Sequence, residues 1–286
     1  MSDDILKTGS FNILSGRGLQ PIERRGFTLV ETLVVVAIFS VLTALGVAGV
    51  ANMQEAGRRV REISSSRTLV AAYLSYANDH GGRLMPGYQY GAESITDPKG
   101  TEISGEEVYR YPWRLAEYIE WNVEGIYLIN RTRKEVAGLD PGSTMYRYTV
   151  ALAPVMGLNA YCVGGNYSAS GLLCPEDVAT RLVQIPRPAK TLAFVSTRYK
   201  AAANTEAMEG YFYARPPVLG PFQWNSGAYD PAVASSQFGF VDFRHNKKAV
   251  CAFIDGHSAL LGIDELRDMR HWAPKAETAD YNLQIY

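Results

Sequence analysis

Residues 24–31 have the sequence RRGFTLVE, and a long run of apolar residues follows them. From Phe27 to Val50 the chain has 24 residues and one charged side chain, Glu31. A bilayer-spanning helix needs about 20 apolar residues, so this segment is long enough to cross a membrane. It is longer than a signal-peptide core, which has roughly 7–15 residues. A passive anchor does not account for Glu31, because ionisable residues in membrane helices are costly and usually functional.

The segment GFTLVE at residues 26–31 resembles the cleavage and methylation site of type IV prepilins and of the related type II secretion pseudopilins. In that family a prepilin peptidase cuts after the glycine and methylates the new aromatic N-terminus. The resemblance implies that Gly26 precedes the cut, that Phe27 is the N-methylated first residue of the mature chain, and that Glu31 is the glutamate used in assembly. The proline that usually bends the family's helix is absent from this span.

The residues after this motif predict one continuous helix from about Thr28 to Asn78, because no proline occurs between Phe27 and Met85. At 1.5 Å per residue, such a helix is roughly 75 Å long. Its first half is apolar on all sides. Its second half has apolar residues at near-helical spacing, which we expect to pack on a sheet, with Glu62 and Ser65 on other faces. These apolar residues are Val60, Ile63, Val70, Leu74 and Ala77.

Length and composition indicate one long helix and one moderate globular domain. The chain has 286 residues, a net charge of −1 and three cysteines. A nearly neutral chain gives no reason to expect a nucleic-acid partner, and three cysteines are too few for a disulfide scaffold. The resemblance divides the chain into a leader peptide at 1–26, a transmembrane and assembly half-helix at 27–51, and an extracytoplasmic globular domain at 52–286.

The middle of the chain is rich in loops. Turn residues at 78–82 predict the end of the long helix, and an apolar run at 191–196 predicts a buried strand. Residues 197–236 are expected to form a long loop that binds a partner. The fold class is therefore α+β, and the resemblance implies a pilin-like arrangement, in which the long helix packs on a small antiparallel sheet with long loops.

The second strong motif lies near the C-terminus, where His245 is followed by nine residues and then by Asp255 and Gly256. This His-x9-Asp-Gly element resembles a domain of pseudopilin-like proteins of planctomycete and verrucomicrobial type. Its residues predict a hairpin within 245–262, with a strand before Asp255, a two-residue Asp-Gly turn and a return strand from His257. We expect a histidine of this segment, His245 or His257, to make a local hydrogen bond that supports the turn.

Two alternatives concern possible sites in the globular domain. His245, Asp255 and His257 could bind a metal, but their spacing matches no established three-ligand site, so no metal or other cofactor is expected. Cys162 and Cys174 could form a disulfide, which would stabilise the domain by roughly 3 kcal/mol.

The sequence contains no nucleophile elbow, zinc-protease motif or phosphate loop, and we expect no catalytic residues and no enzyme activity. The resemblance implies a structural pseudopilin, cleaved by prepilin peptidase and assembled with itself and other pseudopilins into a type II secretion pseudopilus. It implies a single pass through inner-membrane lipid and a periplasmic C-terminal domain. Two alternatives stay open: a type IV minor pilin for adhesion or DNA uptake, and a membrane-tethered extracytoplasmic enzyme or binding protein.

Overall fold

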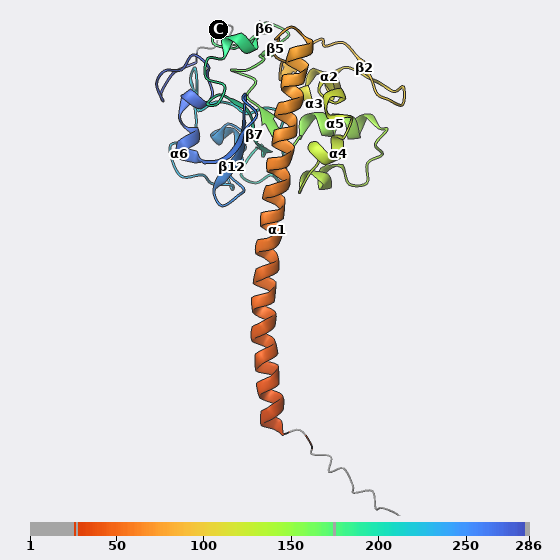
Figure 1. Ribbon diagram of the computed structural model, residues 1–286, viewed down its shortest axis with the longest axis vertical. Helices are drawn as coiled ribbons and strands as arrows, with labels where there is room; N and C mark the ends of the chain where they lie inside the picture. Colours follow the sequence, from red (N-terminus) through yellow and green to blue (C-terminus); the bar gives the residue numbers. More distant parts are fainter. Residues whose placement is uncertain (1–25, 27, 174–175, 284–286) are drawn as a thin grey trace, which may run out of the picture. The chain divides into compact units, whose positions relative to one another are not determined.

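The computed structural model describes residues 26, 28–173 and 176–283, apart from the side chains of residues 45–49 and 51. The chain forms two compact units, Met1–Ala51 and Asn52–Tyr286. Figure 1 shows helix α1, which runs from Leu29 to Asp79, and the mixed helices and strands of the second unit. The long N-terminal helix expected over 28–78 is confirmed, with each end displaced by one residue.

The second unit contains short helices and short strands. The α-helices that follow α1 are α2 Glu106–Tyr109, α3 Tyr111–Arg114, α4 Val123–Ile126, α5 Thr144–Leu152 and α6 Ile263–Leu266. The 3-10 helices are η1 Glu117–Ile119, η2 Thr132–Val136, η3 Leu182–Gln184, η4 Ser235–Phe238 and η5 Met269–His271. The strands are β1 Tyr88–Gln89, β2 Ile95–Thr96, β3 Glu102–Ile103, β4 Met156–Leu158, β5 Asn166–Ser168, β6 Gly171–Leu172, β7 Leu192–Ser196, β8 Arg198–Tyr199, β9 Met208–Glu209, β10 Val218–Leu219, β11 Phe222–Gln223, β12 Lys248–Phe253 and β13 Ser258–Gly262.

The centre of the second unit is a four-stranded antiparallel sheet in the order β13-β12-β7-β4. Cys251 of β12 pairs with Ala259 on one side and with Val195 on the other, which sets the register. Every residue of β7 is buried, which indicates that both faces of this strand are covered. The strand expected at 191–196 is therefore confirmed as β7.

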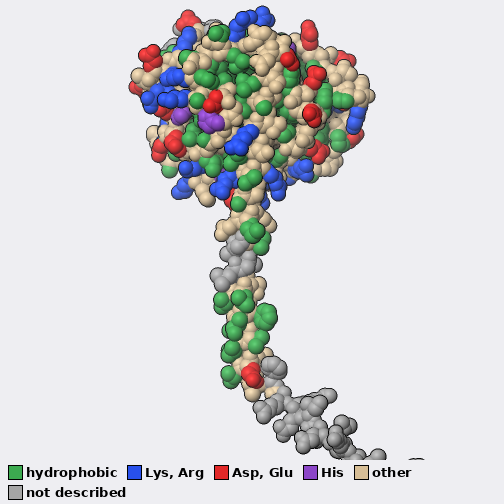
Figure 2. All heavy atoms as spheres, in the orientation of Figure 1, with side chains coloured by type: hydrophobic (Ala, Val, Ile, Leu, Met, Phe, Trp, Pro, Cys, Tyr) green, Lys and Arg blue, Asp and Glu red, His purple; other side chains and the backbone are tan. Residues whose placement is uncertain are grey.

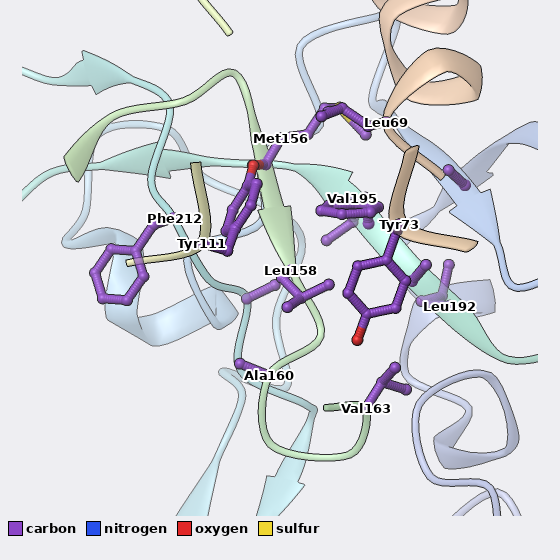
Figure 3. Packing of buried hydrophobic residues seen from close by; sticks show 14 of the residues in the cluster. Leu69, Tyr73, Tyr111, Met156, Leu158, Ala160, Val163, Leu192, Val195 and Phe212 are labelled. Carbon is purple, nitrogen blue, oxygen red and sulfur yellow. The ribbon is translucent and has the colours of Figure 1, made fainter. Parts of the chain in front are cut away.

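The part of α1 within the second unit packs on this sheet. The ring of Tyr73 meets the ring of Phe194 edge-on, with 5.6 Å between their centroids, and Ser66 Oγ lies 2.8 Å from Ser258 Oγ. Figure 3 shows Tyr73 among Leu158, Val163, Leu192 and Val195. The Tyr73 hydroxyl donates to the Met85 carbonyl at 2.9 Å, so this fully buried tyrosine leaves no unpaired donor.

The buried face of α1 includes most of the predicted apolar residues, since Val70 and Ala77 are buried and Ile63 and Leu74 are partly buried against the core. Val60 is 62% exposed, whereas Glu62 and Ser65 are buried. The buried positions of α1 are Glu62, Ser65, Ser66, Leu69, Val70, Ala72, Tyr73 and Ala77, most of which recur at three- and four-residue intervals. The prediction was wrong only for Val60 and for the polar residues, because it placed the latter on other faces, whereas the buried face includes a glutamate and two serines that find partners inside the fold.

The end of α1 follows the predicted turn residues. Gly82 N donates to Ala77 O at 2.7 Å and Gly81 N donates to Asn78 O at 3.2 Å, the two bonds of a Schellman motif. Gly81 has a φ of 63°, in the left-handed region that favours glycine.

The segment 197–236, expected to be one long loop, contains the strand pairs β8-β9 and β10-β11 and the start of η4. The rest of the segment is irregular, as predicted. The four strands were missed because each has two residues, too few for the alternation of apolar and polar side chains that marks a strand.

A glycine substitution tests the packing of the loop beside Tyr73. Gly164 has a φ of 78°, and a Cβ there would overlap the Met85 carbonyl oxygen and lie 2.7 Å from the Tyr73 hydroxyl. We expect Gly164→Ala to lower the free energy of unfolding by more than about 3 kcal/mol, because backbone strain and overlap act together. Urea denaturation followed by circular dichroism measures this change.

Gly171→Ala is the matched control. Gly171 also has a positive φ, 113°, but nothing lies within 4 Å of a Cβ built there. It should lose about 1–3 kcal/mol, from backbone strain alone, and less than Gly164→Ala. Equal losses in the two variants would contradict the close contact at Gly164.

Candidate functional site

The N-terminal motif forms a helix cap. Thr28 precedes the first residue of α1, and its hydroxyl oxygen accepts from Glu31 N at 3.2 Å. Glu31 Oε2 accepts in return from Thr28 N at 2.9 Å and from the Thr28 hydroxyl at 2.8 Å. This reciprocal arrangement is a capping box, whose sequence signal is a threonine followed three residues later by a glutamate. Sequence reasoning missed it, because it considered Glu31 only for assembly.

The processing residues are only partly described. Gly26 is exposed, three residues before α1 begins. Phe27, the residue expected to be methylated, lies outside the described residues.

The first turns of α1 carry exposed apolar side chains. From Leu29 to Leu42 the large hydrophobic residues have exposed fractions between 43% and 81%. Figure 2 shows these green side chains along this part of the helix. In the described part of the chain, no helix combines the length and the apolarity needed to cross a membrane. The span expected at 27–51 stays a prediction, since Phe27 and several side chains of this segment fall outside the description.

The C-terminal motif forms the hairpin of β12 and β13, as expected, but with a different turn. Gly256 N donates to Phe253 O at 2.9 Å, so Ile254 and Asp255 occupy the centre of the turn. Gly256 follows with a φ of 94°, whereas Asp255 has no positive φ. The predicted two-residue Asp-Gly turn is therefore wrong: it needs positive φ at both residues, and here glycine alone takes it, as in a type I turn with a bulge.

Asp255 stabilises this turn through its neighbour. Asp255 Oδ1 accepts from His257 N at 3.1 Å and lies 2.6 Å from His257 Nδ1. The His257 ring stacks on Phe253 with 4.3 Å between centroids. The expected local histidine hydrogen bond at the turn is therefore confirmed, and His257 makes it, not His245.

His245 lies at the other end of β12 and reaches α1. Its Nδ1 lies 2.8 Å from Glu55 Oε1 and its Nε2 lies 3.1 Å from Glu62 Oε2. Only the His245 backbone acts locally, closing a tight turn with Lys248. Among the residues that the structure describes, no group of three His, Cys, Asp or Glu side chains is arranged to hold a metal ion.

Arg244, next to His245, lies within ion-pair distance of three carboxylates. Its Nη1 lies 2.5 Å from Glu209 Oε1 and 3.7 Å from Glu62 Oε2, and its Nε lies 3.1 Å from Asp242 Oδ2. The side chain of Glu62 is completely buried, and that of Arg244 is 13% exposed. We term the six side chains the Glu62 cluster: Glu55, Glu62, Glu209, Asp242, Arg244 and His245.

Burial and charge pairing have opposite effects on the pKa values of Glu62 and His245 in this cluster. Burial alone would raise the pKa of Glu62, but the charge of Arg244 and the hydrogen bond with His245 outweigh it, and the pKa lies below its usual value. Burial alone would lower the pKa of His245, but its interactions with Glu62 and Glu55 outweigh it, and the pKa lies above its usual value. Burial raises the pKa of Glu209. Glu62 and His245 therefore favour the charged forms that attract each other.

The Glu62 cluster joins α1 to the strand that bears the C-terminal motif. Truncation of one partner in a buried ion pair typically costs about 3–5 kcal/mol, because the other charge is left uncompensated. The sequence signal that could have found it is the helical spacing of Glu62 with Ser66, Leu69 and Tyr73. The partners of Glu62 lie more than 180 residues away, at His245 and Arg244, and no spacing rule predicts them.

Two of the three cysteines lie within the described residues. Cys162 and Cys251 are buried. Cys174 lies outside the described residues, so the Cys162–Cys174 bond stays a prediction.

The Glu62 cluster makes the free energy of unfolding depend on pH. Because the folded-state pKa of His245 is raised, its protonated form contributes stability that is fully present below the unfolded-state pKa of about 6.5. This contribution is lost as pH rises through the folded-state pKa. We expect the free energy of unfolding to fall as pH rises above about 6.5, and His245→Gln to reduce that slope. Urea denaturation at pH 5.5 to 8.5 measures it.

His80→Gln is the matched control, since His80 is exposed and has no carboxylate within 4.0 Å among the described residues. It should keep the wild-type slope. An unchanged slope in His245→Gln would contradict the role of the His245–Glu62 pair.

Comparison of the sequence with known protein families gives one match. The family model described as the prokaryotic N-terminal methylation motif matches residues 23–47. No curated protein and no solved structure matches the chain. The matched segment contains Gly26 and the capping box of Thr28 and Glu31. The chain thus carries a type IV prepilin-like N-terminal methylation motif at residues 23–47.

Proposed function

We propose that this chain is the precursor of a pilin-like structural subunit, a pseudopilin that assembles into a type II secretion pseudopilus. The observation that carries the proposal is the methylation motif at 23–47, which runs directly into α1. A fit to a type IV pilin or pseudopilin-like precursor follows from that motif. The function is structural, and the proposal needs no catalytic residue or cofactor.

The first step is processing by a prepilin peptidase. Gly26 is exposed and has no Cβ, so a peptidase can approach the backbone closely there. Cleavage after Gly26 leaves Phe27 as the new N-terminus, one residue before the helix cap at Thr28. Methylation of the Phe27 amine keeps its positive charge.

The second step is the assembly of subunits that leave the inner membrane to form a filament. The exposed apolar side chains between Leu29 and Leu42 suit lipid contacts before assembly and helix contacts within a filament. As neighbouring helices pack around Glu31, its carboxylate loses access to interfacial water and needs a counter-charge. The α-ammonium of Phe27 in a neighbouring subunit supplies it and sets the axial register.

The second compact unit is proposed to be a pilin-like domain on the periplasmic side. The Glu62 cluster supports this role, because the contacts of Glu62 with His245 and Arg244 hold α1 against the end of β12. The hairpin with Asp255 and Gly256 is proposed to belong to the His-x9-Asp-Gly domain of planctomycete and verrucomicrobial pseudopilin-like proteins.

Processing gives a direct test in a host with an active prepilin peptidase. We expect a mature chain that begins at N-methylated Phe27, and we expect Gly26→Leu to block cleavage because its side chain obstructs the peptidase. Intact-mass measurement of the membrane fraction distinguishes the two products. Retention of residues 1–26 in the wild-type chain would overturn the proposed processing.

Substitutions at the cap separate two roles of Glu31. Glu31→Gln keeps the capping box but removes the charge, and Glu31→Val removes both. If the charge pair drives assembly, both variants should lose more than 10-fold in recovered filaments while staying inserted and cleaved. Filament recovery is measured at equal membrane levels of each variant.

Thr28→Ala is the matched control for the cap. It removes the capping hydroxyl, at a cost of about 1 kcal/mol to the helix, and keeps the Glu31 charge. It should assemble nearly as well as wild type. Normal assembly by Glu31→Gln, with failure of Thr28→Ala, would assign Glu31 to the cap and refute the charge pair.

A further inference from the structure

A pocket of about 500 Å³ lies beside the Glu62 cluster, between α1, η2, the β8-β9 pair and the segment that precedes β12. This volume falls within the range of small-molecule sites, which span roughly 300–1,000 Å³. Part of its wall is apolar, with Met208, Pro231 and Phe243. All of these residues belong to the second compact unit.

The carboxylates around the pocket already have partners inside the fold. Glu209 and Asp242 both pair with Arg244, and Asp242 also accepts from the Tyr229 hydroxyl at 2.8 Å. Glu55 lies within ion-pair distance of His245 and of Arg58. Every carboxylate that lines the pocket therefore belongs to the Glu62 cluster and has a partner within it.

Arg198 is different, because it is buried without a counter-charge. It is 5% exposed, and its Nη2 donates to the Val233 carbonyl at 2.9 Å. Its guanidinium lies over the Tyr229 ring at 5.7 Å, and its Nε has no acceptor. Glu209 is its partner across the β8-β9 ladder, yet Glu209 pairs with Arg244. No carboxylate lies within 4.0 Å of Arg198 in the described part of the chain.

The rim of the pocket adds further positive charge. Six of the lining side chains are Lys or Arg, against three Asp or Glu. Of these, Arg131 and Lys247 are exposed and make no ion pair among the residues that the structure describes. A buried charge without a partner is unfavourable, so the pocket favours an occupant that brings a negative charge to Arg198.

We propose that this pocket binds a small organic anion, whose carboxylate or phosphate group pairs with Arg198 and whose apolar body contacts Met208 and Phe243. Guanidinium suits this role because its fork of donors matches both anionic groups. Arg131 and Lys247 attract the anion to the rim. The site goes beyond the proposed structural role and would make the second unit a ligand-binding domain.

The test uses the full-length chain in non-ionic detergent, with phenyl phosphate and benzoate as probes and phenol and benzamide as their neutral counterparts. Isothermal titration calorimetry should show saturable binding of one anion per chain, at least 10-fold tighter than its neutral counterpart. Comparison of the two anions assigns the head group as phosphate or carboxylate. An absence of saturable anion binding overturns the proposal, as does equal binding of the neutral counterparts.

Variants assign the binding to the pocket. Arg198→Gln should weaken binding at least 10-fold, and Arg198→Lys should be intermediate, because a lysine keeps the charge without the fork. The rim variants Arg131→Gln and Lys247→Gln are exposed changes that keep the fold, and each should weaken binding several-fold. Lys99→Gln, an exposed change outside the pocket, should bind like wild type.

Three results would overturn the assignment. The first is unchanged affinity in a folded Arg198→Gln variant. If that variant does not fold, unchanged affinity in both rim variants decides against the pocket. The third is saturable binding of a glutamate-rich peptide without any response to the small anions, which would assign the surface to a protein partner.

Discussion

The second compact unit depends on one buried charge, the carboxylate of Glu62 on α1. A carboxylate with no exposure to solvent is tolerated only where opposite charge and hydrogen-bond donors surround it. Arg244 and His245 supply both from the residues just before β12. This requirement connects the helix to the sheet in one register, because apolar contacts alone accept small shifts whereas a buried ion pair does not.

The same cluster shapes the neighbouring pocket. Arg244 engages Glu62, Glu209 and Asp242 together, which leaves Arg198 without a carboxylate of its own. Five of the six side chains in the Glu62 cluster line or border a pocket with an excess of positive charge. The pairing that stabilises the docked helix therefore also produces an uncompensated arginine.

At the other end of α1, one carboxylate has two possible partners. Glu31 accepts two hydrogen bonds from Thr28 within its own helix. A proposed neighbour in a filament would add an α-ammonium. Both internal bonds end on Oε2, so Oε1 can accept from such an ammonium while the cap persists.

Local sequence determined the features that depend on neighbours in the chain. These are the long helix, its end at Gly81 and Gly82, the buried strand at 192–196, the hairpin near Asp255 and the methylation motif at 23–47. The turn type at Gly256 and the capping role of Glu31 also have local sequence signals, but the predictions assigned the wrong turn and left out the cap.

Only the tertiary structure decided which face of α1 is buried and what His245 contacts. Glutamate is by type a surface residue, and Glu62 becomes a core residue because Arg244 and His245, more than 180 positions later, fold onto it. The two-residue strands of 197–236 likewise have no periodic pattern of their own. Sequence periodicity reports apolar burial, whereas buried charge is set by partners that only the folded chain brings together.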